Sequence, residues 1–176
     1  MALMQNLSAY LWGRLTPLGC FAAVLACMLD QVTKVWLLNV LALGDRGVIH
    51  LAPVLDLALT WNTGISYGLF QTQGPFGQAV LLAIKVAAVI LLWAWLARAS
   101  SRLVAVGLGL IIGGAIGNAI DRLAYGAVAD FVLFHITTAT WSFQWYVFNF
   151  ADAAIVAGVA LLLYESLFAR RAAKVP

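Results

Sequence analysis

Four long runs of apolar residues dominate the chain, at residues 17–38, 76–97, 103–120 and 147–168. A helix needs roughly 17–25 residues to cross the hydrocarbon core of a bilayer. The pattern therefore predicts four membrane-spanning helices. Asp30 and Lys34 lie inside the first run, and no small-residue cleavage pattern follows it, so we expect this run to remain in the mature protein rather than to be removed as a signal peptide.

The two connections at residues 39–75 and 121–146 are too long to be simple turns. Apolar residues alternate with small or polar ones over residues 55–61, which is the period of a half-buried strand. Residues 127–136 form a nearly unbroken apolar run, either a buried strand or a short interfacial segment. The expected fold is an all-α membrane protein of four transmembrane helices with a small extracytoplasmic β-sheet. No linker or repeat divides residues 1–176, so we expect a single integral-membrane domain.

Composition excludes two classes of protein. The chain is 64% hydrophobic and 10% charged, whereas soluble domains carry about 25% charged residues, so neither a soluble globule nor a disordered chain fits. The net charge of +3 does not indicate nucleic-acid binding, because the basic residues form no patch. Six of the ten lie before the first run, around residues 98–102 and in the carboxyl tail. The positive-inside rule then predicts that both termini are cytoplasmic.

Two residue spacings bear on helix packing. Gly109, Gly113 and Gly117 recur every four residues in the third run, a pattern that lets a neighbouring helix approach closely in lipid. Cys20 and Cys27 lie about 10 Å apart along a helix, which is too far for a disulfide between them.

On this topology every aspartate lies toward the exoplasmic side. Asp30 and Lys34 share one helical face and can neutralise each other. Asp121 and Arg122 end the third run and could form a polar interface with Asn118. These groups have structural explanations, and each carries a cost at membrane depth unless it is paired or used.

Asp130 is harder to explain structurally, because its neighbours from residue 127 to residue 134 are all apolar. An isolated carboxylate in such surroundings should be protonated or partnered. Asp152 lies early in the fourth run, where the helix dipole favours a negative charge. We expect the two to face one another and share a proton, Asp152 activating water and Asp130 acting as the acid. That is the chemistry of an aspartyl peptidase.

Other functions fit the sequence less well. Residues 64–68 spell the G-x-S-x-G of serine hydrolases, but Ser66 lacks the alternating βα context of that motif and would need His50 or His135 as its base. The same histidines lack the H-E-x-x-H spacing of a zinc site, so we expect no metal.

A transporter or proton channel could use Asp30, Lys34, Asp121 and Asp152 as a relay, but it predicts acidic groups in the inner half of the membrane as well. Only Glu165, at the inner edge, lies on that side. A noncatalytic scaffold has no use for two carboxylates in apolar surroundings.

Five motifs in order along the chain resemble those of the type II signal peptidases, the lipoprotein signal peptidases of bacterial inner membranes. They are Asp30-Gln31-Val32-Thr33-Lys34, Asn62-Thr63-Gly64, Gly117-Asn118-Ala119-Ile120-Asp121-Arg122, Val128-Ala129-Asp130-Phe131 and Phe148-Asn149-Phe150-Ala151-Asp152-Ala153. The resemblance covers nearly the whole chain. The departures are small, with Phe150 in place of an aliphatic residue and Tyr67-Gly68 where an aromatic residue and serine are common.

The resemblance implies a function and a set of site residues. It implies cleavage of prolipoproteins before a cysteine that carries a diacylglyceryl group, with the lipid held between the helices and the sheet, inhibition by globomycin, and no cofactor, metal or nucleic acid. The catalytic pair would be Asp130 and Asp152. Substrate-binding residues would be Asn62, Gly64, Asn118, Arg122 and Asn149, and the structural supports would be Asp30, Lys34 and Asp121. The glycine-rich stretch 62–77 is the candidate for a loop that closes over the substrate.

Overall fold

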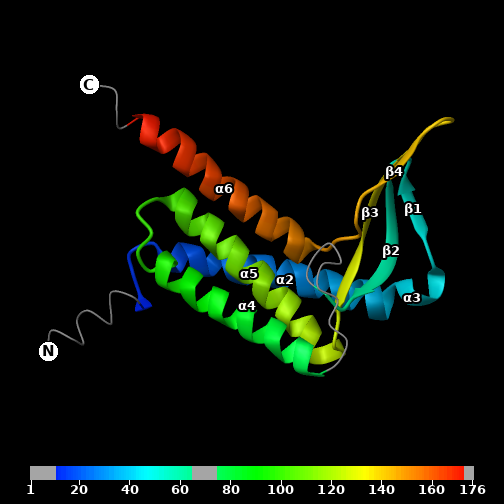
Figure 1. Ribbon diagram of the computed structural model, residues 1–176, viewed down its shortest axis with the longest axis horizontal. Coiled ribbons are helices and arrows are strands. Elements are labelled where there is room, and N and C mark those ends of the chain that lie inside the picture. Colours follow the sequence, from blue (N-terminus) through cyan, green and yellow to red (C-terminus); the bar gives the residue numbers. More distant parts are fainter. Residues whose placement is uncertain (1–10, 65–74, 173–176) are drawn as a thin grey trace, which may run out of the picture.

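The computed structural model describes residues 11–64 and 75–172, as a bundle of helices with an antiparallel sheet across one end (Figure 1). The helices are α2 (Thr16–Val35), its π-helical continuation η1 (Trp36–Val40), the short α3 (Leu43–Arg46), α4 (Pro75–Leu96), α5 (Arg102–Tyr125) and α6 (Phe150–Ala172). The strands are β1 (Ile49–Ala52), β2 (Leu55–Asn62), β3 (Val128–Thr137) and β4 (Ser142–Gln144). The start of α2, the α4–α5 connection and the end of α6 lie at the end of the bundle away from the sheet (Figure 1).

Within the described residues, three helical stretches are long and apolar enough to cross a membrane: Thr16–Val40, Arg102–Tyr125 and Phe150–Phe168. They correspond to three of the four predicted spans. The remaining predicted span forms the 22-residue helix α4, in which the described apolar stretch is the shorter Val86–Leu96.

Two of the predicted spans differ from the observed helices at the ends nearest the sheet. The last span was expected from residue 147, but α6 begins at Phe150, because Phe148 pairs with Val132 as an extension of the sheet. The third span continues past residue 120 to Tyr125, where Gly126 ends α5 in the left-handed conformation. Asp121 and Arg122 therefore lie in the last turns of α5.

Helix α5 is the centre of the bundle and packs on α2, α4 and α6. On one side Gly109 and Gly113 lie directly against the main chain of Gly19 and Ala23, so that a Cβ at either glycine would overlap α2. On another side Gly114 approaches the main chain of α6 just as closely. The predicted glycine packing face is confirmed, and its consequence is that α2, α5 and α6 cross with very little space between them.

The structure contains the small β-sheet that the sequence predicted and settles its open alternative. Its four strands lie in the order β1-β2-β3-β4, all antiparallel. The run at residues 127–136 is a strand, β3, and "all-α" therefore describes the bundle alone. In the pairing of β2 with β3, Thr60 lies opposite Asp130 and Asn62 opposite Val128. This register brings the end of β2 beside the start of β3, at the sheet end of the helix bundle.

Candidate active site

One buried asparagine joins the two aspartates that the sequence singled out. Asn149 lies at the entry to α6, and its Nδ2 donates a hydrogen bond to Asp130 Oδ1 at 2.6 Å. Its Oδ1 accepts a hydrogen bond from the main-chain N–H of Asp152 at 3.0 Å. The structure therefore brings Asp130, on β3, and Asp152, in the first turn of α6, to opposite ends of a single side chain.

The position of Asn149 follows from local structure. Asparagine is among the preferred residues before the first turn of a helix, because its side-chain oxygen can accept an otherwise unpaired N–H. Phe148 is still paired with β3, so the chain passes from sheet to helix within two residues. The start of α6 and the geometry of the aspartate pair are consequently built from the same atoms.

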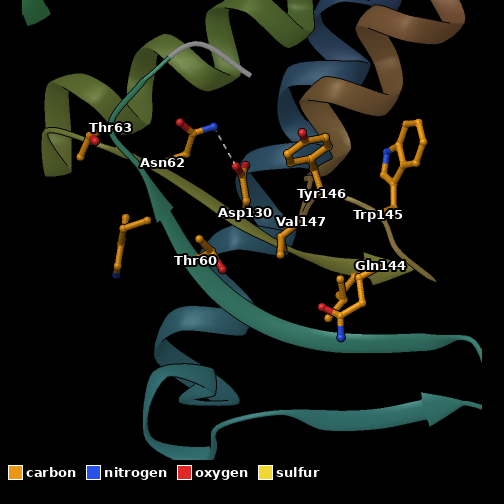
Figure 2. Close-up of a pocket in the computed structure, with 10 residues that line it drawn as sticks. Thr60, Asn62, Thr63, Asp130, Gln144, Trp145, Tyr146 and Val147 are labelled. Carbon is orange, nitrogen blue, oxygen red and sulfur yellow. Dashed lines mark hydrogen bonds between the residues drawn. The ribbon is translucent and has the colours of Figure 1, made fainter. Parts of the chain in front are cut away.

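Two further asparagines each hold one more carboxylate oxygen of the pair. Asn62, at the end of β2, donates from Nδ2 to Asp130 Oδ2 at 3.1 Å, and Figure 2 shows its side chain directed at that carboxylate. Asn118, on α5, donates from Nδ2 to Asp152 Oδ1 at 2.9 Å. Strand β2, helix α5 and the start of α6 thus each contribute one amide to the pair.

The surroundings of Asp130 alter its acidity. The residue is 3% exposed, and burial, reinforced by the nearby charge of Asp152, raises the pKa of its carboxyl to about 6 against the opposing hydrogen bonds of Asn62 and Asn149. A carboxyl group with such a pKa can both hold and release a proton near neutral pH, which suits an acid in catalysis.

Two cavities adjoin these residues. One of about 350 Å³ lies between β2, β3 and the segment that leads to α6 (Figure 2), and is lined by Thr60, Trp61, Asn62, Thr63, Asp130, Leu133, Gln144, Trp145, Tyr146 and Val147. The other, of about 410 Å³, lies between α2, η1, the sheet and α6; apart from Thr33 and Asn149 its lining is apolar. The site therefore has a mixed polar and apolar cavity beside Asp130 and a mainly apolar cavity beside Asn149.

The polar residues predicted as supports form a buried cluster below the pair. Lys34 Nζ lies 2.8 Å from Asp30 Oδ2, the expected pairing, and 2.8 Å from Asp121 Oδ2. Asp30 Oδ1 accepts the main-chain N–H of Ala151 at 3.0 Å, and Asp121 Oδ2 accepts that of Ala129 at 3.1 Å. Ala151 and Ala129 immediately precede Asp152 and Asp130.

Arg122 and Gly64 are brought together by the structure. The guanidinium of Arg122 donates from Nη2 to the Gly64 carbonyl at 2.6 Å and from Nη1 to the Asn118 carbonyl at 3.1 Å. Gly64 in turn donates its N–H to Asn62 Oδ1 at 3.0 Å. Arg122 therefore ties the end of β2 to α5, next to the two asparagines that hold the aspartates.

Sequence reasoning did not assign a role to Gln31. Its Nε2 lies 2.9 Å from Asp121 Oδ1, 3.1 Å from the Gly117 carbonyl and 3.2 Å from Asp30 Oδ2, and donates to all three. A polar amide beside Asp30 in an apolar helix was the available signal.

A role for Asp56 was also missed, because its partners lie on other strands. His50 Nδ1 and His135 Nε2 lie 2.8 and 3.0 Å from its two oxygens, which joins β1, β2 and β3. The hydrogen bond from His50 lowers the pKa of the Asp56 carboxyl, and the contact with His135 adds to this effect. In the described ranges no group of three or more His, Cys, Asp or Glu could hold a metal. Ser66 and most of the predicted closing loop lie outside the described residues.

Known proteins resemble this chain over nearly its full length. Residues 22–168 match the family described as signal peptidase II. Lipoprotein signal peptidases of Nitrobacter hamburgensis and of Rhodopseudomonas palustris strain CGA009 are 60% and 57% identical over 164 residues, 92% of this chain and 100% of each relative.

Two solved structures of bacterial membrane enzymes, obtained by the in meso method at 2.3 and 1.9 Å resolution, superpose with TM-scores of 0.72 and 0.68. They are 25% and 26% identical to this chain, and the alignments cover 89% and 85% of it and 91% and 92% of the solved chains. The fold, the ordered motifs and these relatives agree, and the chain belongs to the signal peptidase II family of proteases.

Proposed function

We propose that the chain is an aspartic endopeptidase that removes signal peptides from prolipoproteins, by hydrolysing the peptide bond before a cysteine that carries a diacylglyceryl group. The observation that carries the aspartic assignment is Asn149, which binds the carboxylate of Asp130 and the main chain of Asp152 at once. The substrate class is supported by the relatives that are lipoprotein signal peptidases.

The chemistry needs one proton on the pair. Asp152, ionised at the amino end of α6, takes a proton from water as the oxygen attacks the scissile carbonyl, and Asp130 gives its proton to the carbonyl oxygen. The tetrahedral species then collapses: Asp152 protonates the leaving nitrogen, and Asp130 recovers a proton from the hydroxyl. The carboxyl groups end as they began.

The predicted substrate-binding residues surround this pair. Asn118 and Asn149 hold the carboxylates in place for attack. Asn62 lines the cavity beside Asp130. Gly64 donates its N–H to the Asn62 side chain, and Arg122 fixes Gly64 to α5. A substrate main chain laid along the end of β2 would meet these amides. Next to them, the buried charges of Asp30, Lys34 and Asp121 act as structural support.

The membrane supplies the second part of the substrate. With α4 as the fourth span, the chain crosses the bacterial inner membrane four times as a single domain, with both termini in the cytoplasm and the sheet on the exoplasmic face. The apolar cavity of about 410 Å³ beside Asn149 suits acyl chains of a lipidated cysteine or of membrane lipids. Globomycin, which the family resemblance implies as an inhibitor, would occupy the polar site.

Two isosteric substitutions test the assignment. Asp130→Asn and Asp152→Asn should each lower cleavage of a diacylglyceryl prolipoprotein by about 10²–10⁴-fold, because each removes a group that transfers a proton. The exposed Asp45→Asn, on α3, is the matched control and should cleave normally. Full activity in either active-site variant, or loss of activity in a folded Ser66→Ala variant, would overturn the aspartic mechanism.

A further inference from the structure

Lys34 uses every hydrogen of its ammonium group on the buried cluster. Beyond the ion pairs with Asp30 and Asp121, its Nζ donates to Asn118 Oδ1 at 3.2 Å. An ammonium has three N–H donors and no acceptor, and Lys34 is 2% exposed. The side chain therefore has no freedom to rotate away, and one of its hydrogens points at the amide that holds Asp152.

This contact determines which way the Asn118 amide faces. Its oxygen accepts from Lys34 and, at 3.1 Å, from Asn149 Nδ2, which leaves its own Nδ2 to donate to Asp152 Oδ1. In the flipped orientation the amide oxygen would face the Asp152 carboxylate and the NH₂ group would face the ammonium. Both contacts would then be repulsive, so the buried positive charge, together with the Asn149 amide, favours the orientation that binds Asp152.

The same ammonium also joins the two carboxylates that hold the main chain next to the reacting residues. Asp30 binds the N–H of Ala151 and Asp121 binds that of Ala129. These two residues precede Asp152 and Asp130, respectively, so the main chain next to each aspartate is held in place by a hydrogen bond. Without a cation between them, the two buried carboxylates would repel each other and these anchors would separate.

We propose that Lys34 is a positioning residue for catalysis: it orients the Asn118 amide toward Asp152 and sets the spacing between the main-chain anchors of Asp152 and Asp130. The inference rests on the proposed function, since it takes these two aspartates as the reacting pair. It goes beyond general support of the bundle, because it assigns to Lys34 an effect on turnover that acts through Asn118.

The test compares two variants of the cluster. Lys34→Met combined with Asp30→Asn removes one charge of each sign, and the new amide can still accept the Ala151 N–H. Compared with Asp30→Asn alone, the double variant should lose about 10- to 100-fold in kcat, the scale of a small misplacement of reacting groups, with KM within about threefold. Gln31→Leu is the matched control. It removes contacts with the same carboxylates but none with Asn118, and should lower thermal stability while keeping kcat.

A mutant cycle separates positioning from mere stability. Adding Lys34→Met to Asp30→Asn should lower kcat much less in an Asn118→Ala background, because the amide that Lys34 orients is gone and only its effect on the main-chain anchors remains. If the double variant does not fold, Lys34→Arg replaces it. The planar guanidinium keeps the charge between the carboxylates but not the third contact in the same geometry, so kcat should fall in a folded protein.

The outcomes distinguish this inference from the proposed function. Wild-type kcat in the folded Lys34 variants, or equal kcat losses in both Asn118 backgrounds, would overturn the positioning role while Asp152→Asn stays inactive. A matching kcat loss in Gln31→Leu would reduce Lys34 to structural support. An active Asp152→Asn protein in the same assay would instead overturn the proposed function.

Discussion

At the scale of single residues, the proposed chemistry depends on how strongly Asp130 is removed from water. Ala129 and Phe131 on either side of it are buried, and its two oxygens meet amide donors from Asn62 and Asn149. These donors favour the ionised form, but burial and the neighbouring Asp152 outweigh them and raise the pKa to about 6. The sequence anticipated an unusual carboxyl group here because no polar neighbour in the strand could neutralise it.

The raised pKa makes stability depend on pH in a defined direction. An unfolded aspartate has a pKa of about 3.9, so the folded protein binds this proton more tightly. The resulting contribution is complete below about pH 4 and is lost as pH rises through about 6. The free energy of unfolding of the wild type should therefore fall by about 2 kcal/mol more than that of Asp130→Asn between pH 4 and 7. Denaturation in detergent across this range measures the difference, and parallel curves would contradict it.

At the scale of the elements, two helix features position the site. Glycines on α5 let α2 and α6 approach so closely that Asp30, on α2, reaches the first turn of α6. The N-cap of α6 is Asn149, whose amide oxygen caps the helix while its nitrogen holds Asp130. Because one side chain makes both contacts, substitutions of Asn149 can separate the effect on helix stability from the effect on the proposed catalysis.

Asn149→Ala and Asn149→Ser should behave differently. Alanine removes the cap and the bond to Asp130, and should cost about 1 kcal/mol of stability together with at least tenfold in cleavage rate. Serine can still cap α6 through its hydroxyl but cannot also reach Asp130 as a donor, so it should restore stability without restoring the rate. Thermal unfolding and turnover, measured on the same preparations, check this. A serine variant with normal turnover would show that the bond to Asp130 is dispensable.

At the scale of the whole molecule, the exposed surface of the helices is strongly apolar and the polar site lies at one end only. Phe21, Val32, Ile90, Leu91 and Val156 are examples of large apolar residues that are more than half exposed on the bundle. In water such a surface would aggregate, whereas in a bilayer it faces lipid. The sheet and the aspartates then lie at one boundary of the apolar layer.

The proposed orientation predicts which side of the membrane each end of the bundle occupies. Both native cysteines are free and can be replaced by alanine, after which single cysteines are introduced at Val54, in the β1–β2 turn, and at Ser100, in the α4–α5 connection. A membrane-impermeant thiol reagent added to intact cells should label Val54→Cys and spare Ser100→Cys. Inverted vesicles serve as the control and should reverse the pattern; the same pattern in both preparations would contradict the proposed orientation.

The sequence by itself determined the apolar spans, the glycine face of α5 and the strands outside the bundle, and it predicted that Asp130 and Asp152 form a pair. Each of these follows from local periodicity or from the free-energy cost of a charge among apolar neighbours. Only the tertiary structure decided that Asn149 spans the pair, that Phe148 delays the start of α6, and that Lys34 faces Asn118. Those contacts depend on strand register and on the rotation of one helix against another, which are set by packing between segments distant in the chain.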